Sequence, residues 1–291
     1  MSLSESLDAH RVSLCQALAV KDGERLDALL TELRSADIAE ILEAILEEEE
    51  DPALTLALMG SLPLERRASV LGHLPGDAQL VLAEAMSDER LLSILEEMGS
   101  DERADLFNLL GEDRRQWLLR RMARREREEL KRLAGYEEGT AGAIMTADYV
   151  AIPSGLTVSQ AMMRVRQTAP DAETVYQLYI VDGEGRLAGT LSLRQLMVAP
   201  PGERIDALMI RDVIHAPVDE AQEEVARIVA RYDLLALPVV DGEARLVGIV
   251  THDDAMDVVE SEATEDIHKG MSIGALAVSY THLTLPTKRI V

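Results

Sequence analysis

The N-terminal half of the sequence carries a pattern of apolar positions that repeats every twelve residues. The first position is held by Leu62, Leu74, Met86, Met98, Leu110 and Met122, and an apolar residue follows eight residues after each: Val70, Leu82, Ile94, Leu106, Leu118 and Leu130. Helix-start signals such as Pro75-Gly76-Asp77 lie between the units. A seven-residue coiled-coil repeat would not keep this spacing. Each unit therefore predicts one short helix.

A short amphipathic helix leaves an apolar face that a neighbour must cover. Two units predict a helical hairpin of 24 residues, and hairpins stacked on one another bury the face that one hairpin leaves open. We expect residues 1–134 to form an all-α superhelical stack of short helices.

From Gly139 onward the pattern changes to short β-branched runs broken by proline and glycine. The segment Val181 to Gly189 (VDGEGRLAG) matches Val240 to Gly248 (VDGEARLVG), and each predicts a strand, a tight turn and a strand. Helices are predicted before and after each hairpin, at 158–167 and 193–198 and again at 220–232 and 253–262. The order β-α-β-β-α thus occurs twice, and units of about 55 residues are small enough that the two copies should pack together.

Composition limits the classes of function. The chain has 53 acidic and 29 basic residues and a net charge of -24, which repels phosphate backbones and anionic headgroups, so we expect no nucleic-acid partner. Cys15 is the single cysteine, as suits a reducing compartment. No run of about 18 apolar residues and no signal-peptide core occurs, so we expect a soluble, cytosolic chain. The sequence shows no Walker loop, zinc-protease motif or nucleophilic triad, and we expect no enzyme.

One segment concentrates acids without any base. Between Arg245 and Lys269 there is no Lys or Arg, yet there are seven acids: Asp253, Asp254, Asp257, Glu260, Glu262, Glu265 and Asp266. Acids three or four residues apart share a helix face and repel each other. A solvated acidic surface is one interpretation. A divalent cation is the other, because Mg²⁺ prefers carboxylate oxygens and usually takes one or two of them.

Several motifs resemble known families. The end of the second hairpin, Gly248-Ile249-Val250-Thr251-His252-Asp253-Asp254, resembles the end of a CBS domain, and two copies make a CBS pair. Four further segments resemble the cytosolic region of MgtE magnesium transporters: Leu62 to Ala68, Ser100 to Leu106, Tyr136 to Met145 and Glu262 to Lys269. The resemblance implies an α+β multidomain fold. Its parts are a helical N-terminal domain at 1–134, CBS domains at 139–202 and 203–265, and the start of a connecting helix at 266–291 with a foreign-looking tail.

The resemblance also assigns ligands. The positions that match magnesium-binding acids are Asp101, Asp105, Glu223, Asp233, Asp254, Asp257, Glu262, Glu265 and Asp266. In CBS domains the matching hydroxyl and carboxylate, here Thr251 and Asp254, hold the ribose of an adenine nucleotide, and Arg194 could reach a phosphate. The first copy has Ser192 and Gln195 instead, so we expect one nucleotide site per pair.

The leading hypothesis is an intracellular Mg²⁺ sensor that gates an MgtE-type transporter. It implies a homodimer through the CBS pairs, attached to a transmembrane domain at the cytoplasmic face of the inner membrane. Mg²⁺ is the implied cofactor, with ATP as a candidate second ligand. The alternatives are an adenine-nucleotide sensor belonging to another protein and a helical scaffold that binds neither ligand.

Overall fold

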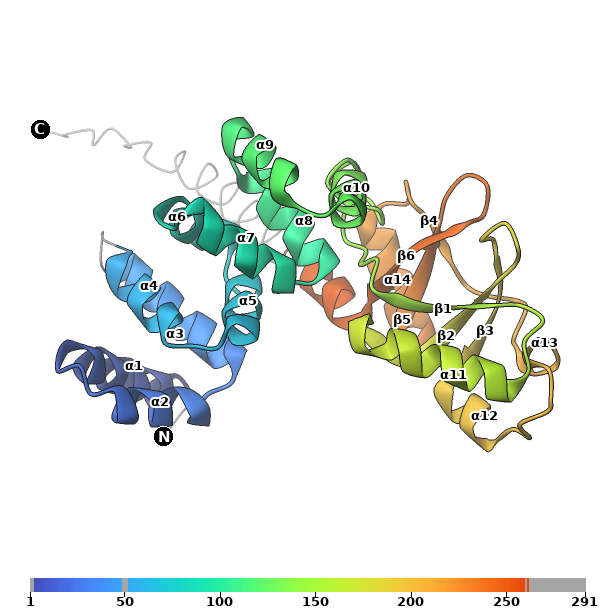
Figure 1. The fold of residues 1–291 in the computed structure, drawn as a ribbon, viewed down its shortest axis with the longest axis horizontal. Helices are drawn as coiled ribbons and strands as arrows, with labels where there is room; N and C mark the ends of the chain where they lie inside the picture. The colour runs from blue at the N-terminus through green and yellow to red at the C-terminus, as the bar shows by residue number, and fades with distance from the viewer. Residues whose placement is uncertain (1–2, 49–51, 260, 262–291) are drawn as a thin grey trace, which may run out of the picture. The chain divides into compact units, whose positions relative to one another are not determined.

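The structure is a computed structural model that describes residues 3–48, 52–259 and 261 (Figure 1). These residues divide into two compact units. The first unit runs to Tyr136 and includes the short segment Thr146–Asp148, and the second contains Glu137–Met145 and the residues from Tyr149 onward.

The first unit is built from α-helices. Their bounds are α1 (Leu3–Ala19), α2 (Gly23–Glu32), α3 (Ser35–Glu48), α4 (Ala53–Gly60), α5 (Leu64–Gly72), α6 (Gly76–Ala85), α7 (Asp88–Glu97), α8 (Ser100–Leu109), α9 (Glu112–Arg121) and α10 (Arg124–Leu133). The six twelve-residue units correspond to α5 through α10, which confirms the prediction of one helix per unit. The first apolar position of each unit lies two residues before its helix, the second lies within it, and both are buried.

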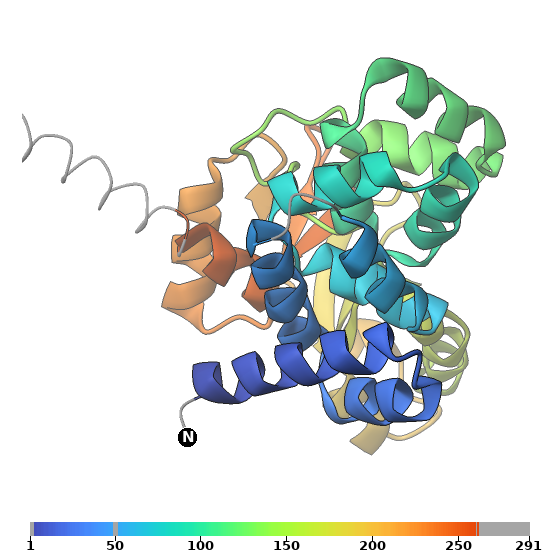
Figure 2. The same cartoon turned by 90° about the vertical axis from the view of Figure 1, so that its left-hand side faces the viewer.

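The helices stack with a period of two. The closest packing joins alternate helices, α5 with α7, α6 with α8, α7 with α9 and α8 with α10. Alternate helices are 24 residues apart, so the predicted 24-residue period is the period of stacking. Within α5–α10 the close packing is between alternate helices, so the apolar seam there is buried mainly between successive hairpins. Near the N-terminus α1 lies beside α2 and also contacts α3 and α4 (Figure 2).

Polar side chains at a fixed place in the repeat cap the preceding helix. Arg67 donates hydrogen bonds to the carbonyls of Gly60 and Leu62, both at 2.7 Å. Gln79, twelve residues later, donates to the carbonyl of Leu74 at 2.8 Å, and Arg103 donates to that of Met98 at 2.8 Å. The last carbonyls of a helix have no partner within the helix, and their partial negative charge favours a cation.

A second set of arginines joins more distant helices. Arg66 of α5 donates to the carbonyls of Leu30 and Leu33 at the end of α2, at 2.9 and 2.7 Å. Arg114 of α9 donates to the carbonyl of Met86 after α6 at 2.7 Å and forms an ion pair with Asp88 at 2.9 Å. These bonds link helices about 30 residues apart.

The second unit repeats one small fold. Its elements are β1 (Tyr149–Pro153), α11 (Val158–Thr168), the 3₁₀ turn η1 (Ala169–Asp171), β2 (Thr174–Val181), β3 (Leu187–Ser192), α12 (Leu193–Val198), α13 (Ile205–Leu208), β4 (Ala216–Pro217), α14 (Gln222–Tyr232), β5 (Ala236–Val240) and β6 (Leu246–Thr251). Residues 252–259 are helical. The predicted order β-α-β-β-α is confirmed in both copies, while α13 and η1 were not predicted.

Each copy forms a three-stranded sheet. The first strand is parallel to the second, and the second is antiparallel to the third, in the orders β1-β2-β3 and β4-β5-β6. In the first copy, α11 and α12 pack on the sheet over buried aliphatic side chains, with Ile152, Leu178, Ile180 and Leu191 fully buried. A further apolar cluster, containing Tyr179 and Ile249, joins the two copies.

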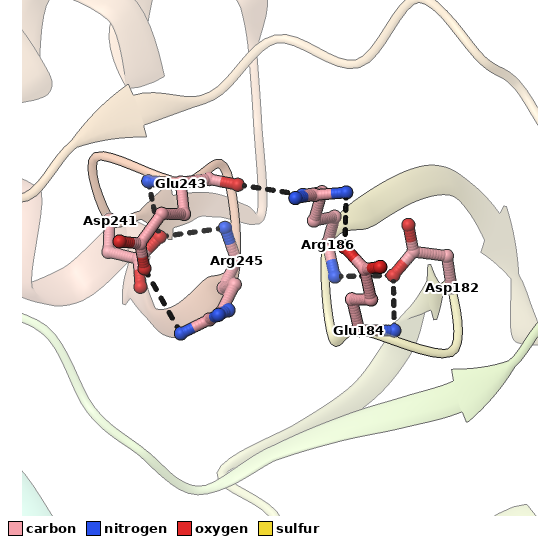
Figure 3. Close-up of polar contacts among 6 residues, drawn as sticks. All are labelled: Asp182, Glu184, Arg186, Asp241, Glu243 and Arg245. Carbon is pink, nitrogen blue, oxygen red and sulfur yellow. Dashed lines mark hydrogen bonds and ion pairs between the residues drawn. The ribbon is translucent and has the colours of Figure 1, made fainter.

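Hydrogen bonds join the two hairpin turns, and Figure 3 shows one of them, from Nε of Arg186 to the carbonyl of Glu243 at 3.1 Å. The amide of Leu187 donates to the carbonyl of Ala244, and the amide of Leu246 donates to that of Gly185, both at 3.0 Å. These pairs are equivalent in the two repeats, so the copies pack together as predicted. Gly185 has a φ of +83° and Ala244 a φ of +62°, so the second turn holds an alanine in a conformation that glycine adopts without steric cost.

An aspartate shapes each turn from within. Asp182 accepts hydrogen bonds from the amides of Glu184 at 2.8 Å and Arg186 at 2.9 Å (Figure 3). The bond from the Arg186 amide is the main reason that the pKa of Asp182 is lowered. Asp241 makes the equivalent bonds in the second copy. The acidic VDGE segments are therefore structural turns, with no need of a bound ligand.

Candidate metal and nucleotide sites

Asp101 lies at the start of α8, beside two hydroxyls and a second carboxylate. The Ser100 hydroxyl is 3.0 Å from the Thr146 hydroxyl and accepts a hydrogen bond from the Ala147 amide at 2.7 Å. Asp148 accepts a bond from the Ser100 amide at 3.0 Å. This polar group joins α8 to a segment almost fifty residues further along the chain. The structure therefore adds three oxygen-bearing neighbours, Ser100, Thr146 and Asp148, to the predicted ligand Asp101.

The charge on Asp101 is unfavourable in this environment. Desolvation by burial is the largest reason that the pKa of this carboxyl is raised, and repulsion by Asp148 adds to it. Hydrogen bonds from the backbone of Asp101 and Glu102 and from the Thr146 side chain act in the opposite direction without cancelling the effect. A cation bound to Asp101 would remove part of this cost.

Asp105, the other predicted ligand on α8, is exposed one helical turn after Asp101. Residues four apart share a helix face, so the two predicted ligands lie on one side of α8. Among the described residues, no group of three or more His, Cys, Asp or Glu lies close enough to hold a metal ion. Mg²⁺ usually takes one or two protein carboxylates and keeps several waters, so the assignment of Asp101 and Asp105 as ligands stays a prediction.

The second unit holds the other predicted ligands in different local settings. Glu223 lies in the first turn of α14, and Asp233 caps its end with a φ of +52°. Asp254 and Asp257 lie on the helical residues 252–259. Glu262, Glu265 and Asp266 fall outside the described residues. Because the α8 ligands and these acids belong to separate units, a shared ion stays a prediction.

The predicted ribose pair also has a local structural role. The Thr251 hydroxyl donates to the Asp254 carboxylate, and the Thr251 amide donates to the same oxygen at 3.3 Å. In the first copy Ser192 and Gln195 form a capping box at the start of α12. The Thr-x-x-Asp motif therefore orders a helix start, so a ribose would replace a bond that already exists. Arg194 is exposed in the first turn of α12.

Tyr179, which the sequence reasoning missed, carries an unusual polar group. Its ring is fully buried and packs edge to face with Tyr149, with centroids 6.3 Å apart. The Tyr149 hydroxyl donates to the carbonyl of Leu246 at 3.0 Å, whereas the Tyr179 hydroxyl has no partner among the described residues. Burial raises the pKa of Tyr179. The only sign in the sequence was a tyrosine within a predicted strand. The alternation of apolar and polar residues along a strand does not distinguish a core residue from one that contacts a ligand.

Both units match known protein families. Residues 33–139 match the family described as the MgtE intracellular N domain, and residues 141–202 and 205–261 match the CBS domain. The structure resembles the cytosolic domain of the Mg²⁺ channel MgtE in complex with ATP, with 41% identity, a TM-score of 0.78, and coverage of 85% of this chain and 99% of that one. The chain belongs to the MgtE family. Its N-terminal helical stack and CBS pair confirm the predicted recognition and fold class.

Other MgtE proteins are also similar to this chain. The soluble part of a magnesium transporter is 31% identical, with a TM-score of 0.77 and coverage of 88% of this chain and 99% of that one. The magnesium transporter MgtE of Thermus thermophilus is 55% identical over 146 residues, which are 50% of this chain and 32% of that protein. The Bacillus subtilis MgtE is 42% identical over 159 residues, 55% of this chain and 34% of that protein. The chain spans about a third of the length of these curated MgtE relatives.

Proposed function

We propose that this chain is the Mg²⁺-sensing region of an MgtE-type magnesium transporter. The observation that carries the proposal is the group at the start of α8, where Asp101 lies beside the Asp148 carboxylate and the Ser100 and Thr146 hydroxyls. Bound Mg²⁺ would offset the repulsion between these acids. The predicted ligands Glu223, Asp233, Asp254 and Asp257 supply further carboxylates from the second CBS copy.

Sensing requires that Mg²⁺ bind one arrangement of the units more tightly than another, because a ligand shifts an equilibrium only by its differential affinity. Several weak sites acting together produce a larger shift than one weak site. Ions shared by the helical unit and the CBS pair would favour a compact arrangement and a closed pore. When Mg²⁺ is lost, the acids repel and the arrangement loosens.

Within the described residues, no helix is long and apolar enough to cross a membrane. The curated relatives are about three times as long as the matched region and are called magnesium transporters. We place the pore in a transmembrane domain to which this region attaches at the cytoplasmic face.

Millimolar MgCl₂ is expected to raise the thermal midpoint and to lower the radius of gyration of the full chain, because each bound ion stabilises the compact state by mass action. Thermal unfolding and small-angle scattering measure the two effects. The double variant Asp254→Asn and Asp257→Asn should show a smaller rise in thermal midpoint and a smaller fall in radius of gyration. Asparagine keeps an acceptor oxygen for the Thr251 hydroxyl. Unchanged scattering of the native chain would contradict the proposal, and a large loss of stability in the Mg²⁺-free variant would make these acids structural.

An adenine nucleotide is the second candidate ligand, since a structurally similar MgtE cytosolic domain was crystallised with ATP. Calorimetric titration of MgCl₂ and of ATP into the same protein separates a Mg²⁺ sensor from a nucleotide sensor. Asp254 belongs to both predicted sites, so each ligand should change the affinity of the other by the same factor. Stabilisation by ATP alone, with no response to Mg²⁺, would favour the nucleotide sensor.

We also propose that the chain forms a homodimer through the CBS pair. An apolar groove of about 590 Å³ lies between α11 and α12 in the first copy. Around it Met163, Met197 and Val198 are 57%, 68% and 78% exposed, whereas the second repeat has Arg227 and Asp257 at the places of Met163 and Val198. An exposed apolar surface on one copy favours a protein contact there.

The variant Met197→Asp with Val198→Asp is expected to shift the chain from dimer to monomer, because it buries two charges in the proposed contact. Analytical ultracentrifugation measures the change. The control Arg227→Asp alters the matching face of the second copy. A monomeric native chain, or equal dissociation in both variants, would contradict the use of this surface.

A further inference from the structure

We propose that an arginine cluster at the turn between α9 and α10 binds anionic phospholipid headgroups at a bilayer surface. The cluster consists of Arg120 and Arg121 at the end of α9 and Arg124 and Arg125 at the start of α10. All four side chains are exposed. This inference goes beyond the proposed sensing function, since it requires neither Mg²⁺ nor a nucleotide.

The cluster stands out against the composition of the chain. The twelve residues from Arg114 to Arg125 include six arginines and no acid, in a protein with a net charge of -24. Arg114 and Arg115 of this run face the protein and pair with Asp88 and Glu112. The four arginines of the cluster are left at the surface.

Few carboxylates neutralise the cluster. Arg124 pairs with Glu128 at 2.8 Å, and both side chains of that pair are largely exposed. Within the described part of the chain, Arg120, Arg121 and Arg125 form no ion pair with a carboxylate. An exposed ion pair contributes little stability and is readily exchanged. At least three positive charges are therefore available to a partner.

The net negative charge of the chain does not prevent this contact. The Debye length is about 8 Å at physiological ionic strength, so a surface that touches the cluster is screened from acids further away. Each basic side chain near an anionic membrane contributes about 1 kcal/mol of attraction. Local charge, and not the net charge, then decides the interaction.

An aromatic side chain accompanies the cluster. The guanidinium carbon of Arg121 lies 4.2 Å from the ring centroid of Trp117, one turn earlier on α9. The stacking holds Arg121 against the half-buried indole. Tryptophan beside basic residues suits the boundary between headgroups and acyl chains, where one part of the ring is apolar and the other is hydrated. A bilayer fits this combination better than a purely polar polyanion.

Co-sedimentation of the full chain with vesicles tests the proposal, in buffer with EDTA and without nucleotide. Vesicles of phosphatidylcholine with phosphatidylglycerol should bind the chain at low salt and release it at high salt, and pure phosphatidylcholine vesicles should not bind it. Replacing all four arginines of the cluster with glutamine should lower the partition coefficient by roughly a hundredfold or more, because each of the three unpaired charges that is lost removes about a fivefold factor. Replacing them with lysine should keep most of the binding.

A matched control replaces four exposed arginines elsewhere with glutamine: Arg164, Arg166, Arg211 and Arg231. Both glutamine variants lose four positive charges, so a loss confined to the cluster variant supports the proposal and an equal loss in both overturns it. Failure of the native chain to bind phosphatidylglycerol vesicles at low salt also overturns it, as does tighter binding to a short RNA duplex than to vesicles. Circular dichroism melting shows whether each variant is folded. Because Mg²⁺ is absent, failure here leaves the sensing proposal standing.

Discussion

Replacing Arg114 with methionine is expected to lower the free energy of unfolding of the helical unit by about 3 kcal/mol. The guanidinium of Arg114 donates to the carbonyls of Ala83 and Met86 and pairs with the Asp88 carboxylate. Methionine keeps much of the apolar stem but leaves these acceptors without their charged donor, and an uncompensated half-buried carboxylate is costly. Urea denaturation followed by circular dichroism measures the loss.

Arg90→Met provides the matched control. Arg90 holds the same place in the repeat 24 residues earlier, and its side chain is exposed. Exposed substitutions of this kind usually change stability by less than about 0.5 kcal/mol. Equal losses in the two variants would contradict the view that Arg114 joins α9 to the end of α6.

Replacing Asp101 with asparagine is expected to stabilise the Mg²⁺-free chain at neutral pH and to weaken its response to Mg²⁺. The pKa of Asp101 is raised in the folded state, chiefly by desolvation. Its contribution to stability is therefore fully present below the unfolded pKa, near 3.9, and is lost as the pH rises through the folded value. Asparagine does not ionise. As the pH rises above about 4, the free energy of unfolding of the variant should therefore come to exceed that of the native chain, by an amount on the order of 1 kcal/mol.

Urea unfolding from pH 4 to pH 7, with EDTA and then with MgCl₂, measures both effects. In MgCl₂ the native chain should become as stable as the variant, because the ion offsets the repulsion between Asp101 and Asp148. The stability of the variant should change less when MgCl₂ is added. Asp105→Asn is the control for pH dependence, since Asp105 is exposed on the same helix. Parallel pH profiles for the native chain and Asp101→Asn would show that the carboxyl is not destabilised by its surroundings.

Much of the fold could be predicted because it is encoded over short distances in the chain. The twelve-residue spacing placed α5 through α10, since the apolar face of a helix and its start signals recur within one or two turns. The matching VDGE segments located both hairpins, because an aspartate that bonds to amides two and four residues later shapes its own turn. Resemblance of ordered motifs then gave the family.

The sites depended on contacts between distant parts of the chain. Only the path of the chain brings Thr146 and Asp148 to Ser100 and Asp101 on α8. The link from Arg114 to the end of α6 is likewise tertiary, and so is the burial of the Tyr179 hydroxyl, which has no partner in the part of the chain that the structure describes. A side chain's charge cost and hydrogen-bond partners depend on which distant atoms displace water around it. Sequence spacing determined the elements, and tertiary packing determined the surroundings of each candidate ligand.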